Sequence, residues 1–126
     1  MKIINTSKAP GAIGPYSQGI VAGDFFFASG QIAIIPETGE IAENTIEAQT
    51  KQVLENVGAL LEAAGAGYEN VVKTSCFLAD MGDFAKFNEI YAQYFSDHKP
   101  ARSCVAVKTL PKGVLVEVEV IAESTL

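Results

Sequence analysis

A single arginine stands among the nine basic residues of this 126-residue chain; the other eight are lysines. It is Arg102, in the segment Pro100-Ala101-Arg102-Ser103-Cys104-Val105. A guanidinium is a planar fork of N–H donors that can hold a carboxylate through two hydrogen bonds, which the point charge of lysine cannot do. This pattern favours a carboxylate-binding role for Arg102. A lone arginine on a lysine-rich surface is the other interpretation.

Two glutamates alternate with valines near the C-terminus. Because side chains two residues apart point to the same face of a strand, Glu117 and Glu119 share one face. Either carboxylate could serve as a general base or orient a water molecule. A strand face that meets only solvent is the alternative interpretation of the same pattern.

Small residues occur at two places that suit the wall of a ligand pocket. Tyr16 lies in a glycine-punctuated loop, residues 11 to 19, whose backbone can approach a ligand or a neighbouring chain closely. The loop lacks the spacing of either common phosphate-binding motif. The apolar strand that follows it runs into Ala28-Ser29-Gly30-Gln31, and small residues within a strand mark a bulge or a close backbone contact.

The remaining inventory argues against several other chemistries. The one histidine, His98, has no cysteine or histidine near it in the sequence, so no metal-ligand spacing is present. It lies in a polar stretch typical of a helix end, which does not favour a nucleophile–histidine pair. Cys76 and Cys104 are far apart and are interpreted as reduced thiols. We therefore expect neither a metal nor an organic cofactor.

The composition argues against nucleic acid and membrane as partners. The formal net charge is −6 at pH 7 and the lysines are scattered, so a nucleic acid backbone would be repelled. No apolar run has the length of a signal peptide or a membrane span, which predicts a cytoplasmic location and no membrane contact. The length fits one domain covering residues 1–126.

Periodicity predicts two helices and about six strands. The first helix is expected to begin at Asn44, with Glu47 completing a capping box, and to end before Gly65. The second is expected to be capped by Asp83 and to stop before Pro100, with an aromatic stripe that is interpreted as core packing. The predicted strands are residues 2–5, 19–21, 25–35, 71–79, 103–107 and 114–122.

Two helices can cover only one face of such a sheet. Along the last predicted strand the valines at the even positions would lie under the helices, and the opposite face would combine apolar residues with Glu117 and Glu119. A mixed face of this kind is suited to contact another subunit while keeping an ionisable pocket.

Several motifs resemble the Rid (YjgF-type) family in their order and spacing. They are Ala12-Ile13-Gly14-Pro15-Tyr16-Ser17-Gln18-Gly19, Ala28-Ser29-Gly30-Gln31, Thr38-Gly39-Glu40, Val72-Lys73-Thr74, Phe87-Asn88-Glu89-Ile90-Tyr91, Pro100 to Val105 and Val116-Glu117-Val118. Each motif is weak alone, but the ordered set runs from one end of the chain to the other. The sequence is therefore similar to this family over its whole length.

The resemblance implies an α+β, chorismate-mutase-like fold, in which a six-stranded mixed sheet carries two helices on one face. It further implies a homotrimer that encloses a central barrel, with a cleft at each subunit interface. By correspondence, Arg102 would bind the substrate carboxylate and Glu117 would position the attacking water. Residues expected to line the same cleft are Tyr16, Ser29, Gly30, Asn88 and Cys104.

The activity implied by the resemblance is hydrolysis of reactive 2-imino acids, 2-iminobutanoate and 2-iminopropanoate, to 2-keto acids and ammonia without a metal or cofactor. Two alternatives from other classes stay open. The chain could be a regulatory protein that binds 2-keto acids without turnover, or an endoribonuclease or translation inhibitor. The net charge of −6 and the single arginine argue against an endoribonuclease or translation inhibitor, which would bind nucleic acid.

Overall fold

The computed structural model describes all residues, 1–126, as one mixed sheet with helices on one side. The strands occur in the order β1-β2-β3-β6-β4-β5; β4 and β5 are parallel, and every other pair is antiparallel. Their bounds are β1 (Lys2–Ile4), β2 (Gly19–Ala22), β3 (Phe25–Ala28), β4 (Val71–Leu78), β5 (Ala101–Ala106) and β6 (Val116–Glu123). The predicted α+β class and six-stranded mixed sheet are confirmed.

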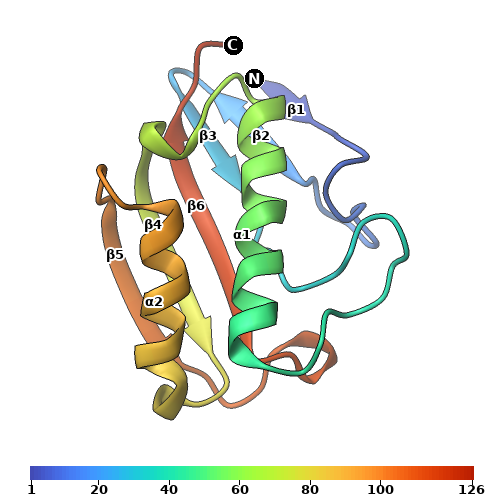
Figure 1. Cartoon of the computed structure of the whole chain (residues 1–126). Helices are drawn as coiled ribbons and strands as arrows, with labels where there is room; N and C mark the ends of the chain where they lie inside the picture. Colours follow the sequence, from blue (N-terminus) through green and yellow to red (C-terminus); the bar gives the residue numbers. More distant parts are fainter.

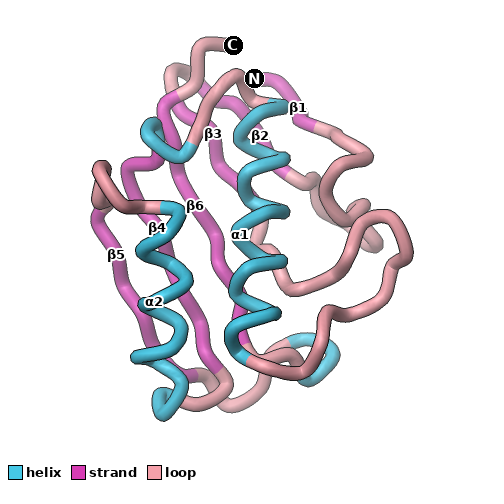
Figure 2. Tube along the Cα trace, viewed as in Figure 1, coloured by secondary structure: helices cyan, strands magenta, loops and turns pink.

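Two helices, α1 (Ile46–Ala63) and α2 (Phe84–Tyr94), lie side by side against the same face of this sheet (Figure 1). The tube view shows no helix of comparable length on the far side (Figure 2). The apolar stripe of α1 and the valines of β6 are buried against each other, as the sequence pattern predicts. No helix has the length and apolarity needed to cross a bilayer.

The first helix begins one residue later than predicted. Its N-cap is Thr45, which has extended backbone angles and accepts a hydrogen bond from the Ala48 amide at 3.2 Å. Asn44 instead accepts a 3.4 Å bond from the side chain of Gln49. The hydroxyl of Thr45 reaches the third helical amide, so the predicted capping box of Asn44 and Glu47 is wrong by one position.

The second helix also begins differently from the prediction. Asp83 stands at the N-cap position, but its side chain makes no capping hydrogen bond. A short 3₁₀ turn over Met81–Asp83 comes first, and Asp80 caps that turn by accepting a 2.8 Å bond from the Gly82 amide. The polar cap therefore lies one turn upstream of α2.

The predicted strand over residues 25–35 is much shorter in the structure, because β3 ends at Ala28. Its ladder with β6 pairs Phe27 with Ile121, but the next pair on this side is Gln31 with Val118. Four steps on one strand thus oppose three on the other, which is the geometry of a β-bulge. The bulge falls at Ser29 and Gly30 and turns them away from the regular ladder.

Strand β5 begins two residues earlier than the predicted range of 103–107. Its parallel ladder with β4 pairs Lys73 with Ala101 and Thr74 with Arg102. Arg102 therefore belongs to the sheet itself rather than to the bend before it, which fixes the face from which its side chain projects.

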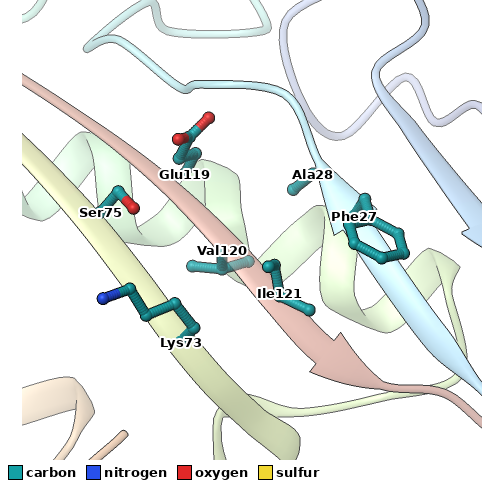
Figure 3. A pocket seen from close by; sticks show the side chains of 7 residues that line it. All are labelled: Phe27, Ala28, Lys73, Ser75, Glu119, Val120 and Ile121. Carbon is teal, nitrogen blue, oxygen red and sulfur yellow. The ribbon is translucent and has the colours of Figure 1, made fainter. Parts of the chain in front are cut away.

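The face opposite the helices is open. Phe25 and Phe27 expose 41% and 45% of their surface there, and the glutamates of β6 project from the same side. Figure 3 shows this face around a cavity of about 240 Å³, with Lys73, Ser75 and Glu119 standing above the strands. The uncovered face thus combines apolar and charged side chains. The sequence predicts this mixture for β6, whereas the aromatic rings of Phe25 and Phe27 add to it from β3.

Candidate active site

The predicted site residues form two groups separated by the sheet. Thr74 is the register partner of both Arg102 and Val120, so all three side chains point toward the helices. Glu117 lies at an odd position of β6 and points to the open face. Within one chain, therefore, the structure does not bring Arg102 and Glu117 together.

Helix α2 holds the guanidinium of Arg102 in place. Nη1 donates a 2.7 Å hydrogen bond to Oδ1 of Asn88. The guanidinium carbon also lies 5.4 Å from the ring centroid of Phe84 and 4.9 Å from that of Tyr91, within the range of cation–π attraction. These three helical positions, i, i+4 and i+7, share one face of α2.

Arg102 has no carboxylate partner in the chain. The one ion pair within 4.0 Å joins Lys86 to Glu47, elsewhere on the surface. Asn88 accepts only one of the five N–H donors of the guanidinium, so the others can receive an external carboxylate in the bidentate geometry. The arginine is thus oriented and charged, and its charge is not neutralised within the chain.

Cys104 accompanies Arg102 on the helix side of β5. It is the register partner of Cys76, and both thiols are free. Burial raises the pKa of each thiol, that of Cys76 to about 12. Both are therefore protonated at neutral pH, and the predicted reduced state agrees with this environment.

The second group surrounds a cavity of about 620 Å³ on the other side of the sheet. Tyr16, Ser29, Gly30 and Glu117 all line it, whereas Arg102, Asn88 and Cys104 do not. Glu117 is half-buried, and its pKa is raised, first by burial and then by the neighbouring charge of Glu119. A carboxylate whose pKa is shifted toward neutrality can accept and return a proton more readily than an exposed one.

Hydrogen bonds hold the loop that carries Tyr16 against this cavity. The buried amide of Gln18 accepts from the Thr6 amide at 2.8 Å and donates to the carbonyls of Thr6, Ala9 and Pro10. Ser29, interpreted from the sequence as a substrate-binding residue, donates its hydroxyl hydrogen to the Ser17 carbonyl at 2.6 Å. In this structure it joins the loop to the end of β3.

Several residues at these sites were not assigned a site role from the sequence. Phe84 and Tyr91 were interpreted as core packing, yet both also contact the guanidinium. Their spacing from Asn88 is the signal that could have found them. Gln18, Gln31 and Lys112 line the cavity of Glu117, and nothing in their spacing indicates this.

The sequence profile described as Endoribonuclease L-PSP matches residues 6–124. The chain belongs to this family. The chain is 56% identical over 121 residues to a RutC family protein of Pyrococcus horikoshii, and the alignment covers 96% of each chain.

Two other relatives of the chain have more specific names. It is 46% identical over 121 residues to the human 2-iminobutanoate/2-iminopropanoate deaminase, covering 96% of this chain and 88% of that protein. It superimposes on the crystal structure of Escherichia coli TdcF with bound serine with a TM-score of 0.94 and 47% identity, over 99% of this chain and 100% of the other. The resemblance to the Rid (YjgF-type) family is thereby confirmed.

Proposed function

We propose that this chain hydrolyses 2-imino acids, such as 2-iminobutanoate and 2-iminopropanoate, to 2-keto acids and ammonia. The observation that carries the proposal is the oriented guanidinium of Arg102, which has no carboxylate partner of its own. A small acid with a carboxylate beside its reactive carbon complements that fork. The names of relatives at about half identity supply the reaction class.

The second half of the chemistry belongs to Glu117. Its carboxylate takes a proton from water as the water oxygen attacks C2 of the imine, and it then passes this proton to the imine nitrogen, which gives a carbinolamine. The carboxylate next takes the hydroxyl proton of the carbinolamine and delivers it to the nitrogen, so that the C=O bond forms, the C–N bond breaks and ammonia departs. One water is consumed and one ammonia is released, so the carboxylate ends as it began.

This mechanism needs Arg102 and Glu117 from different copies of the chain. The two side chains project from opposite faces of one sheet, so an acid of three or four carbons cannot touch both in a single copy. The open face, with its exposed Phe25 and Phe27, is suited to association with further copies. A homotrimer around a central barrel, with one cleft per interface, satisfies both requirements and is part of the proposal.

The experiment generates 2-iminobutanoate with threonine dehydratase and traps it with semicarbazide in the presence and absence of the purified chain. We expect the wild-type chain to shorten the lifetime of the imine. Arg102→Ala and Glu117→Gln should each remove most of this effect. An imine lifetime that does not depend on the chain, or an Arg102→Ala variant as active as wild type, would overturn the proposal.

The same preparation distinguishes the alternatives. Binding of 2-ketobutyrate with no effect on imine decay would favour a regulatory ligand-binding protein. The family description also names endoribonuclease activity. An RNA affinity that falls steeply with salt, together with RNA cleavage lost in Arg102→Ala, would favour that activity instead, although a net charge of −6 opposes it.

A further inference from the structure

Two buried hydroxyl groups meet next to Arg102, between the sheet and α2. Thr74 on β4 is fully buried, and Tyr91 on α2 is 8% exposed. Their oxygens are 2.8 Å apart, which is a short hydrogen bond between neutral groups. They belong to the motifs Val72-Lys73-Thr74 and Phe87 to Tyr91, and the proposed mechanism gives neither hydroxyl a role.

This pair connects the two elements that determine where the guanidinium lies. Thr74 is the register partner of Arg102 in the parallel ladder, so the two side chains are neighbours on the same face of the sheet. The ring of Tyr91 lies 4.9 Å from the guanidinium carbon, and Asn88, on the turn before it, accepts the bond from Nη1. The position of α2 on the sheet therefore determines the contacts that Asn88 and Tyr91 make with Arg102.

Packing alone does not explain the tyrosine. Its ring already contacts Phe87 on the same helix and Phe95 at the C-cap, with centroids 5.5 Å and 4.7 Å away, and a phenylalanine would fill the same space. The hydroxyl has one partner, Thr74, which in turn accepts a weak 3.8 Å bond from the thiol of Cys76. A buried hydroxyl is unfavourable unless it is paired, so each partner requires the other.

We infer that Thr74 and Tyr91 are positioning residues, which lock α2 onto the sheet so that the fork of Arg102 faces an incoming carboxylate. The inference rests on the proposed function only in taking a carboxylate as the ligand of Arg102. Neither hydroxyl touches the ligand. They act indirectly, because they position the ring of Tyr91 and the side chain of Asn88, and these two groups orient the guanidinium of Arg102.

The test uses Tyr91→Phe, Thr74→Val and the double variant. Each single change keeps the shape of the side chain and removes one hydroxyl. We expect the Kd for 2-ketobutyrate and the KM for the imine to rise about threefold to tenfold, with kcat within twofold of wild type. The double variant should be no worse than either single variant, because both remove the same hydrogen bond.

Tyr68→Phe is the matched control. The Tyr68 hydroxyl also makes a short bond, donating to the Leu54 carbonyl at 2.7 Å, but the rings that contact Arg102 are those of Phe84 and Tyr91. The control should lose comparable thermal stability and keep the wild-type Kd. If it weakens 2-ketobutyrate binding as much as Tyr91→Phe does, general loosening explains the effect and the inference is overturned.

The lone arginine provides a readout that does not depend on activity. Because Arg102 is the only arginine, a ¹⁵N spectrum contains a single Nε–Hε signal. We expect one sharp signal in wild type and Tyr68→Phe, and a broadened or shifted one in Tyr91→Phe and Thr74→Val. An unchanged signal in both variants would refute the positioning role. A wild-type chain that leaves imine lifetime unchanged would refute only the proposed activity.

Discussion

The carboxylate of Glu117 occupies the space into which a side chain at position 30 would project. A Cβ built on Gly30 would overlap the Glu117 carboxylate oxygen and lie 2.9 Å from its Cδ. The backbone of Gly30 is not in the left-handed region, so alanine is allowed there conformationally. The absence of a side chain at position 30 therefore makes room for Glu117, and the turn does not demand glycine.

Gly30→Ala should consequently displace the Glu117 carboxylate while the fold persists. The clashing atoms are the far end of a flexible side chain, so we expect a loss of about 1 kcal/mol or less in the free energy of unfolding. The kcat for imine hydrolysis should fall about tenfold or more, because the base leaves its position. In a Glu117→Gln background the same change should cause little further loss. A full additional tenfold loss there would show that Gly30 acts on something other than Glu117.

Asn88→Asp places a carboxylate where an amide oxygen now accepts from Arg102 at 2.7 Å. The variant is nearly isosteric, so the fold should tolerate it, but the guanidinium would then be neutralised by an internal partner. We expect the affinity for 2-ketobutyrate to fall about tenfold or more, measured by calorimetry. Asn88→Ala removes the bond without adding a charge, and its effect should be smaller. Equal affinities in Asn88→Asp and wild type would mean that this guanidinium does not bind the ligand.

The pH dependence of the reaction should report Glu117. Burial and then the charge of Glu119 raise the pKa of Glu117, and the base form exists only above that pKa. Activity should therefore decline on the acid side at a pH above the ordinary range for glutamate. Glu119→Gln removes the like charge, lowers the pKa of Glu117 and moves the acid limb to lower pH. The limb should still lie above the ordinary glutamate range, because burial is the larger cause. A limb that moves to higher pH in Glu119→Gln would contradict this assignment.

The alternation of valines and glutamates in residues 114–122 predicts which side of β6 is buried, because the period of two is a local property of a strand. The bulge at Ser29 and Gly30 could be suspected from the small residues, but its effect on the length of β3 depends on pairing with β6. Thr45 and Asn44 are both good caps, and only the path of the chain decides between them.

The separation of Arg102 from Glu117 could not be predicted from the sequence. The face from which Arg102 projects is set by its register with Thr74, a residue 28 positions away on a different strand. Such pairings depend on the tertiary structure. The alternation within one strand shows which of its residues share a face, but it does not show which residues of another strand lie on that same face. The chemical nature of both residues was visible in the sequence, whereas their placement on opposite faces required the fold.

Mixing two inactive variants tests whether one site draws on two copies. Arg102→Ala keeps its own Glu117, and Glu117→Gln keeps its own Arg102. If the chain forms cyclic trimers with a site at each interface, every mixed trimer contains one interface where an intact arginine meets an intact glutamate. Refolding the two variants together in equal amounts should restore about a quarter of the wild-type rate, because three quarters of the trimers are mixed and each has one good site in three. The two variants mixed without refolding should stay inactive. Activity that stays absent after the subunits have exchanged, as verified by mass spectrometry of the mixed oligomers, would mean that Arg102 and Glu117 do not act together across an interface.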